Sequence, residues 1–426
     1  MKITIYGGKK DLNLKKYSNV YCIDIGRIKS KCNYLTDLLR FNEIALEYSN
    51  KYADYIYSFN KKYFLENKLI FNNKISFYFI SELSNKRTEK YKTYHHICHA
   101  LLIKEIIENE NIQEIEFLNC EYSFVLMLKD YLIKNNIKIV LNKSIYNNLL
   151  IKKFYKIFYL YKQFLFLIKI IVSFIVLKLF YVKKNTKEIE NIFLTRYPLH
   201  LNNKFRDDKY SDYVKENDMF LVSILTDGFH QNLNLIKLIK SLIKINYNNK
   251  SVLLEKYLYL KDILIFLKIV KKLLNQNIFY DSAFEELNLK FVISNEIFDS
   301  FLKIPRLLLY YNSIKRVFKK NKINCFYLYL HEYVYGRLFS IVINIENINV
   351  NVIGFQHGPA SKRKLLYVLS KDEFISFNEK HKYKKCLTKM FLPDKILCED
   401  LLSKCIYENN GYSNVYIMEE IYRLKY

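Results

Sequence analysis

The sequence is poor in the residues that interrupt regular structure, and it has no tryptophan. Among 426 residues there are eight glycines and four prolines, while lysine, isoleucine, asparagine and tyrosine dominate. This composition is typical of an AT-rich genome, so the position of a residue is more informative here than its abundance. The sequence contains no tandem repeat and no low-complexity segment. We therefore expect two or three folded domains with ample apolar content for their cores.

Signature motifs of several common enzyme classes are also missing. The chain has no P-loop lysine motif, no GxGxxG and no GxSxG. Kinases, dinucleotide-dependent dehydrogenases and hydrolases of the usual kinds are therefore disfavoured. Gly7 and Gly8, after the first apolar run, would let the backbone approach a phosphate, but a pair of glycines carries little weight alone.

The cysteine pattern is that of a reduced protein. Eight cysteines are spread along the chain without a CxxC pair. Met1 is followed directly by the strand-like KITIYGG and not by a signal peptide. We therefore expect a cytoplasmic protein.

A histidine-rich cluster, His95, His96, Cys98 and His99, raises the question of a metal site. On a helix His95 and His99 would share a face, as zinc ligands can. The glutamate of HExxH is missing, however, and no third ligand is evident. We expect a packing or helix-start role for the cluster, and no metal cofactor.

The charge is strongly one-sided. Lysine and arginine number 68 against 42 aspartates and glutamates, which gives a net charge of +26. A protein with this positive charge would attract nucleic acid, anionic lipid and phosphorylated substrates. The lysines are spread along the whole length and form no basic arm, so nucleic acid is not an expected partner.

Apolar segments alternate between strand-like and helix-like periodicity, which predicts an α/β fold with largely parallel sheets. The predicted domains are an N-terminal α/β domain (1–146), a helical connector (147–187) and a second α/β domain (188–426). Further expectations concern single elements: a helix over 93–109, strands over 74–80, 191–195, 290–293, 325–330 and 350–353, and one basic helix over 306–320.

The connector contains the longest apolar run, QFLFLIKIIVSFIVLKLFYV at 163–182. It is long enough to cross a bilayer, but Lys169 and Lys178 interrupt it, and a lysine near the centre of a spanning helix costs about 2.5 to 3.5 kcal/mol. A helix lying on an anionic membrane surface and a helix packed between domains fit the run better.

The stretch NVIGFQHGPA concentrates scarce residues, because Gly354, Gly358 and Pro359 fall within six positions. We expect the preceding strand to end at Gly354 and to deliver Gln356, His357 and Gly358 into a loop. The strand over 325–330 would similarly deliver His331 and Glu332.

In open α/β sheets ligands bind at the carboxyl ends of the strands. If the two strands are neighbours, Glu332 and His357 could approach one another, an arrangement suited to general base chemistry. The alternative is that these residues cap helices and satisfy loop amides.

Arg196, Arg206, Asp207 and Asp208 follow another predicted strand, over 191–195, at the same kind of edge. Arginine suits phosphate or carboxylate through paired hydrogen bonds. Arg196 and Arg206 are therefore candidate substrate-binding residues, and a solvated charged loop is the alternative.

Three short motifs carry a family resemblance. The block from Leu330 to Pro359, with Glu332, Gly336, Arg337, an amphipathic helix and IGFQHGP, resembles bacterial surface-carbohydrate glycosyltransferases with two Rossmann-like domains, the GT-B-like type. The segments FLTRYPL (193–199) and PDKILC…LLSK…NGY (393–412) are similar to text in the same family. In that family a further nucleotide-binding half, often with a His-Pro motif, follows the QHG region. Here 69 residues follow His357 and there is no His-Pro.

The resemblance implies a GT-B-like fold and transfer of a sugar from a nucleotide-sugar donor to a lipid-linked or polysaccharide acceptor, in capsule or lipopolysaccharide assembly. His357 and Glu332 would be catalytic, and Gln356, Gly358, His331, Arg196 and Arg206 would bind substrate, without a metal. The expected location is peripheral, on the cytoplasmic side of the inner membrane. The alternative is a non-catalytic scaffold of polysaccharide assembly with a degenerate transferase fold.

Overall fold

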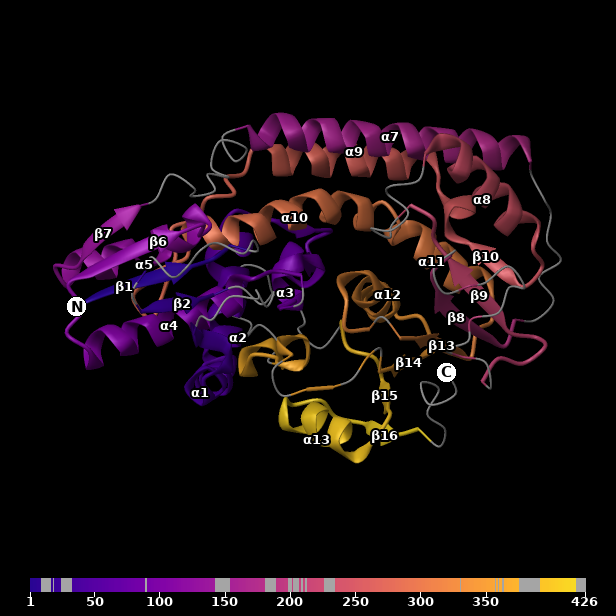
Figure 1. Ribbon diagram of the computed structural model, residues 1–426. Coiled ribbons are helices and arrows are strands. Elements are labelled where there is room, and N and C mark those ends of the chain that lie inside the picture. Colours follow the sequence, from indigo (N-terminus) through magenta and orange to yellow (C-terminus); the bar gives the residue numbers. More distant parts are fainter. Residues whose placement is uncertain are drawn as a thin grey trace.

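The structure is a computed structural model (Figure 1). It describes residues 1–8, 17, 19–23, 33–88, 90–141, 154–180, 189–197, 201, 207, 210, 213–225, 234–329, 331–356, 358, 360–361, 364–374 and 391–418.

The first sheet has five parallel strands in the order β3-β2-β1-β6-β7. Their bounds are β1 Lys2–Tyr6, β2 Val20–Cys22, β3 Asn33–Tyr34, β6 Glu114–Leu118 and β7 Lys138–Leu141. Helix α4 (Thr93–Asn109) precedes β6 in the chain, and helix α5 (Tyr122–Lys134) connects β6 to β7. Alternate residues of β1 face opposite sides of the sheet, so Ile3 and Ile5 enter the main core while Tyr6 joins a smaller cluster.

The second sheet has seven parallel strands in the order β10-β9-β8-β13-β14-β15-β16. Their bounds are β8 Asn191–Thr195, β9 Met219–Val222, β10 Ser251–Leu253, β13 Cys325–Leu328, β14 Asn351–Phe355, β15 Lys395–Cys398 and β16 Val415–Ile417. Helices α8 (Leu235–Tyr247), α12 (Val334–Ile345) and α13 (Leu401–Asn409) connect them. Near-continuous apolar strands are typical of parallel sheets whose two faces are both covered.

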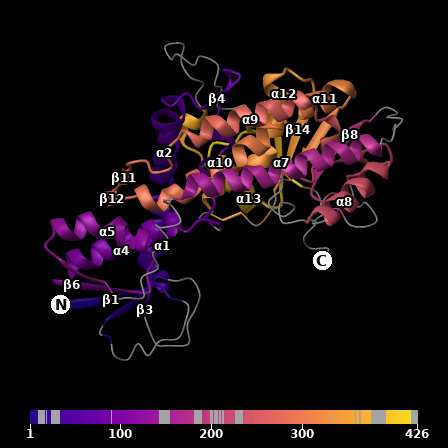
Figure 2. The ribbon, with the colours of Figure 1, turned by 90° about the horizontal axis from the view of Figure 1, so that it is seen from above.

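Three long helices run from one sheet toward the other (Figures 1 and 2). These are α7 (Tyr155–Leu179), α9 (Leu260–Leu274) and α10 (Lys290–Leu308), with α11 (Tyr311–Lys320) after them. Helix α10 packs on α3 (Glu82–Asn85) and α5, beside the first sheet, and also contacts α7, α9 and the segment Phe77–Ile80. One continuous apolar core therefore includes residues of both sheets and of these helices.

Short elements complete the described chain. They are η2 (Leu35–Asp37), α1 (Leu39–Glu47), α2 (Ser49–Phe59), η3 (Asn60–Leu65), β4 (Ile70–Phe71), β5 (Ile75–Ser76), η4 (Phe77–Ile80), η6 (Leu254–Tyr257), β11 (Ala283–Phe284), β12 (Leu287–Asn288), η7 (Leu365–Tyr367) and η8 (Lys371–Phe374).

The fold class predicted from the sequence is confirmed: this is an α/β protein with two parallel sheets of Rossmann-like order, and the 25-residue helix α7 lies between them in the chain. The predicted helix over 93–109 and strand over 191–195 have the predicted bounds.

Four predictions about single elements were wrong. In 74–80 only Ile75–Ser76 is a strand, because Ser76 Oγ accepts a hydrogen bond from Tyr78 N and starts the 3₁₀-helix η4. Residues 290–293 are the first turn of α10, a short apolar run for which periodicity does not distinguish strand from helix. The helix over 306–320 is two helices, α10 and α11, with Pro305 in the last turn of α10. Strand β14 continues through Gly354 to Phe355.

Candidate functional site

The carboxyl ends of β8 and β13 mark the switch point of the second sheet. From β8 the chain adds β9 and β10 on one side, then crosses over and adds β13 to β16 on the other. Tyr210 ties the two strand ends together, since its hydroxyl donates to Leu194 O (2.9 Å) and accepts from Tyr329 N (2.9 Å). In open α/β sheets, ligands bind in the crevice outside such a switch point.

A cleft of about 440 Å³ opens at this place. Its walls come from α3 and the segment after it, from the face of α10, from Arg196 after β8, and from the start of α12. The lining residues are Glu82, Asn85, Arg87, Lys90, Arg196, Asp299, Leu302, Lys303, Arg306, Leu307, Tyr333, Val334 and Tyr335. Small-molecule sites have volumes of roughly 300 to 1,000 Å³, so the cleft has the size of a ligand site.

Two of the cleft's lysines are paired with its carboxylates. Lys303 bonds to Glu82, and Lys90 lies 2.7 Å from Asp299 and 3.6 Å from Glu82. Burial alone would raise the pKa of Glu82, but Lys303 and Lys90 hold it below its ordinary value. The nearby Glu296 is buried, which raises its pKa to about 8 and keeps it protonated at neutral pH. The carboxylate charge at this wall is therefore balanced by the two lysines.

Three arginines add positive charge to the cleft. The Arg87 guanidinium lies 4.8 Å from the centre of the Tyr333 ring. Burial lowers the pKa of Arg306 to about 10, so that side chain is still charged at neutral pH. Arg196 is the third arginine. Because the two lysines already balance the two carboxylates of the cleft, the three arginines give it a net positive charge, which suits an anionic ligand.

The start of α12 contributes to the same wall. Val334 and Tyr335, the first two residues of the helix, line the cleft, and the N-cap residue Tyr333 makes no side-chain capping bond. The first backbone N–H groups of a helix have no partner within the helix, and its dipole favours negative charge there. Phosphate groups bind at such helix starts.

Asn85 is a residue of the cleft whose side-chain amide makes no hydrogen bond within the described chain. Its side chain is 1% exposed, it lines the cleft, and neither its Oδ1 nor its Nδ2 has a hydrogen-bond partner among the described residues. A buried amide without partners costs about 1 to 3 kcal/mol, so such a group indicates a bound ligand or ordered water.

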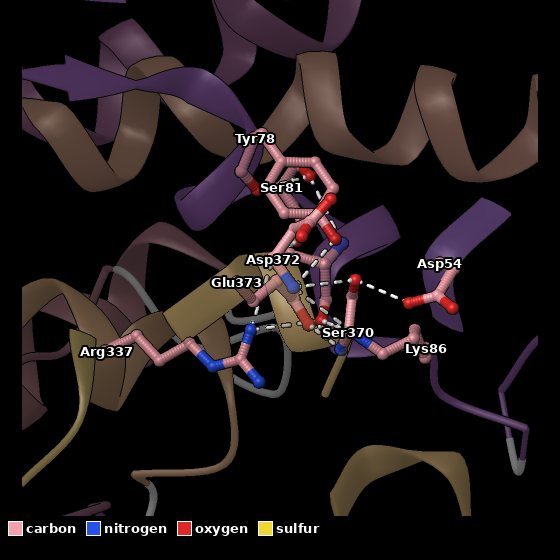
Figure 3. Close-up of polar contacts among 9 residues, drawn as sticks. Asp54, Tyr78, Ser81, Lys86, Arg337, Ser370, Asp372 and Glu373 are labelled. Atoms are coloured by element: carbon pink, nitrogen blue, oxygen red, sulfur yellow. Dashed lines mark hydrogen bonds and ion pairs between the residues drawn. The ribbon is translucent and has the colours of Figure 1, made fainter. Parts of the chain in front are cut away.

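A buried polar cluster holds the cleft segment of residues 82–87 in place (Figure 3). Lys86 Nζ lies 3.2 Å from Glu373 Oε2, and both side chains are fully buried. Glu373 also accepts hydrogen bonds from Tyr78 Oη (2.8 Å) and Ser370 N (2.8 Å). Arg337 of α12 donates to Ser84 O (3.1 Å). The start of α12 and the residues beside Asn85 are thereby fixed relative to one another.

The predicted site residues His331 and Glu332 directly precede the cleft residue Tyr333 in the chain. Both are buried; Glu332 Oε1 accepts a hydrogen bond from Tyr407 Oη and lies 3.9 Å from His331 Nε2. Burial, together with the charge of Arg337, lowers the pKa of His331 to about 3, so the imidazole is neutral. Their neighbours Tyr333 to Tyr335 line the cleft, and these two residues do not.

The other predicted site residues are placed as follows. Strands β13 and β14 are neighbours, as the sequence argument required. Gln356 Nε2 donates to Gly358 O (2.8 Å) and to Ser403 Oγ (3.1 Å), and Gln356 Oε1 accepts from Glu399 N (2.9 Å). Of the arginines, Arg196 lines the cleft. His357, Arg206 and Asp208 lie outside the described residues.

Asp207 and the histidine cluster have packing partners. Asp207 accepts hydrogen bonds from Thr195 Oγ1 and from Tyr329 Oη (3.3 Å). His99 of α4 lies against the Phe41 ring, with centroids 4.8 Å apart, and burial lowers its pKa. Within the described residues no group of three or more His, Cys, Asp or Glu is arranged to hold a metal ion.

Sequence reasoning missed most of the cleft. Asn85, Arg87 and Lys90 lie in the polar stretch SNKRTEK, and Asp299, Lys303 and Arg306 recur at helical spacing on α10. That spacing was a detectable signal of one polar helix face, but the two segments are more than 200 residues apart in the chain.

No family model, no curated protein and no solved structure matches this chain. The fold is therefore what is shown: an α/β protein with two parallel sheets, and a cationic cleft at the switch point of the second.

Proposed function

We propose that this protein is a glycosyltransferase that transfers a sugar from a nucleotide-sugar donor to a lipid-linked or polysaccharide acceptor in surface carbohydrate biosynthesis. The supporting observation is the cleft, where Arg196, the start of α12 and the unsatisfied amide of Asn85 meet at the switch point of a Rossmann-like sheet. The family resemblance of the QHG region points to the same class of reaction.

In this proposal the cleft binds the phosphate group or groups of the donor. When the bond to the sugar breaks, negative charge grows on the departing nucleoside phosphate. Arg196, Arg87 and the N–H groups at the start of α12 would stabilise that charge, because preorganised donors and fixed cations act strongly in a site from which water is excluded. This scheme needs no metal ion, and Asn85 would hydrogen-bond a polar group of the donor.

The acceptor hydroxyl must lose a proton, and we propose His357 as the base. It follows Gln356 at the end of β14, the neighbour of β13 in the sheet. Glu332, four residues after the end of β13, is proposed to act with it. Gln356, Gly358, His331 and Arg206 stay proposed substrate-binding residues. We place the protein in the cytoplasm, at the inner membrane.

Calorimetry with CMP, UDP and GDP, each alone, tests the proposal. One nucleotide is expected to bind clearly, and Arg196→Ala is expected to weaken it about tenfold or more, because charge-assisted bonds to phosphate contribute about 1.5 to 3 kcal/mol. The matched control is Arg40→Ala: Arg40 of α1 pairs with Glu105 of α4, neither residue lines the cleft, and the loss of Arg40 should leave nucleotide affinity unchanged. Equal nucleotide affinities of Arg196→Ala and wild type would contradict the proposal that the nucleotide binds in the cleft.

A non-catalytic scaffold of polysaccharide assembly is the second candidate. The observation that favours it is the burial of His331 and Glu332, with Glu332 Oε1 accepting a hydrogen bond from Tyr407 Oη. A scaffold of this kind would bind none of the three nucleotides, so the same titrations separate the two functions.

A further inference from the structure

The inward face of helix α7 carries polar as well as apolar side chains. The buried side chains form one stripe along the helix: Tyr159, Gln163, Phe166, Ile170, Ser173, Val176 and Leu177. Gln163 Nε2 donates to Leu302 O (3.0 Å), and Gln163 Oε1 accepts from Arg306 Nε (3.2 Å). This stripe fixes α7 on α10 through hydrogen bonds as well as apolar contacts.

The outward face of α7 is apolar. Ile157, Phe164, Ile175 and Leu179 are 68, 60, 50 and 75% exposed, and they recur at helical spacing along the side opposite Gln163. A helix on the surface of a water-soluble protein normally carries polar side chains there. Contiguous apolar patches of this kind mark sites that another apolar surface covers.

Helix α9 extends the same surface. It lies beside α7 in both ribbon views (Figures 1 and 2), and the two helices are in contact. Leu260, Leu264 and Leu267 are 64, 59 and 41% exposed and are spaced i, i+4, i+7. The exposed apolar surface is thus built from two helices that are about 80 residues apart in sequence.

The charges around this surface are almost all positive. Lysines lie on α7, on α9 and on α8, which packs against α7: Lys156, Lys162, Lys178, Lys237, Lys240, Lys244, Lys261, Lys268 and Lys271. The sole acidic residue in these three helices is Asp262, which is buried and lies 2.6 Å from Arg316.

We propose that the surface formed by α7 and α9 docks in the plane of an anionic lipid bilayer. The exposed Ile, Leu and Phe side chains would enter the boundary between headgroups and acyl chains, and the surrounding lysines would contact lipid phosphates. Helix α7 is about 37 Å long, so the proposed contact is an extended one.

By length and composition alone α7 is also suited to cross a membrane. Its polar stripe, however, is hydrogen-bonded to α10, and a spanning helix would have to break the bonds of Gln163. Arg306, the partner of Gln163, also lines the cleft, so the docking helix and the cleft share one wall. The docking proposal rests on the exposed surface and is independent of the reaction proposed for the cleft.

Vesicle cosedimentation of the full chain, without nucleotide, tests the proposal. Wild type is expected to bind vesicles of phosphatidylglycerol and phosphatidylcholine at least tenfold more tightly than pure phosphatidylcholine, with affinity falling as salt rises. The double substitution Phe164→Asp with Leu264→Asp is expected to weaken binding at least tenfold. The matched control, Leu401→Asp with Leu402→Asp on α13, changes two side chains that are 65 and 60% exposed and should bind like wild type.

Thermal unfolding of all three proteins shows whether the substitutions leave the fold intact, as their exposed positions predict. Four outcomes would overturn the proposal. They are equal binding to neutral and anionic vesicles, wild-type binding by the α7/α9 variant, protein that stays in the membrane after alkaline carbonate extraction, and light scattering that shows a dimer which the α7/α9 variant converts to monomer. The third outcome means a spanning helix, and the fourth means that a second copy covers the surface.

Discussion

Lys86 shows how a charged residue can be placed where water does not reach. It adopts a left-handed backbone conformation (φ 48°, ψ 43°) at the end of α3, and its ammonium is buried against Glu373. Removing one partner of a buried ion pair is far more damaging than removing an exposed pair, because the remaining charge stays without compensation.

Glu373→Gln is therefore expected to lower the free energy of unfolding by about 3 to 5 kcal/mol near neutral pH, measured by urea denaturation. Burial lowers the pKa of Lys86, with a further contribution from Arg337, while Glu373 opposes the shift. A lysine whose folded-state pKa is depressed binds fewer protons when folded than when unfolded, so stability rises with pH up to its ordinary value of 10.5. The difference in free energy of unfolding between wild type and the variant should therefore shrink as the pH approaches 10.

The control for this prediction is Glu286→Gln. Glu286 pairs with Lys104 and Lys134 on the surface, and its side chain is 57% exposed, so the change should leave the free energy of unfolding nearly unchanged. Adding Lys86→Met to Glu373→Gln should recover part of the loss. A pH-independent loss in Glu373→Gln would mean that shape, and not charge, determines the effect.

At the scale of elements, strand β14 explains one of the scarce glycines. A Cβ at Gly354 would lie 2.8 Å from His331 Nδ1 and 2.9 Å from Pro393 Cγ, both closer than side chains tolerate. Gly354 is thus required by the packing of β14 against the end of β13. The sequence singled out this glycine correctly but gave the wrong reason, a turn, since the strand continues past it.

Gly354→Ala is expected to lower the free energy of unfolding by about 1 to 3 kcal/mol in chemical denaturation, because a methyl group must be forced into a filled site. Gly358→Ala is the matched control: its Cβ would have open space, with Lys364 Nζ nearest at 3.9 Å. Adding His331→Ala to Gly354→Ala should relieve the clash. If both glycine variants were equally destabilised, close packing at His331 would not be the cause.

Single elements also show how much the sequence could predict. Helix α4 was predicted to the residue because its apolar pattern is long, and parallel strands were found because they are short apolar runs bounded by polar residues. The cleft could not be assembled in this way. Lys90 and Asp299 are 209 positions apart and meet only because α10 returns to the first sheet, and periodicity contains no information on such a return.

At the scale of the whole molecule, the two sheets are joined by more than the chain. Helix α10 packs on α3 and α5 beside the first sheet. It also lines the cleft together with Arg196, which follows strand β8 of the second sheet. Phe79 stacks on Phe391, with ring centroids 5.5 Å apart, and Glu82 N donates to Ser300 Oγ at 2.9 Å. The buried apolar side chains of the two sheets belong to one continuous core.

Because neither sheet can lose its structure without exposing that core, we expect the protein to unfold in a single transition. Scanning calorimetry should give one peak whose calorimetric and van't Hoff enthalpies agree. Ser300→Ala should shift that peak down without splitting it, because it leaves the buried Glu82 N–H without its acceptor, at a cost of about 1 to 3 kcal/mol. Two resolved peaks would instead mean that each sheet carries an independent core, and that the helices between them act as a linker.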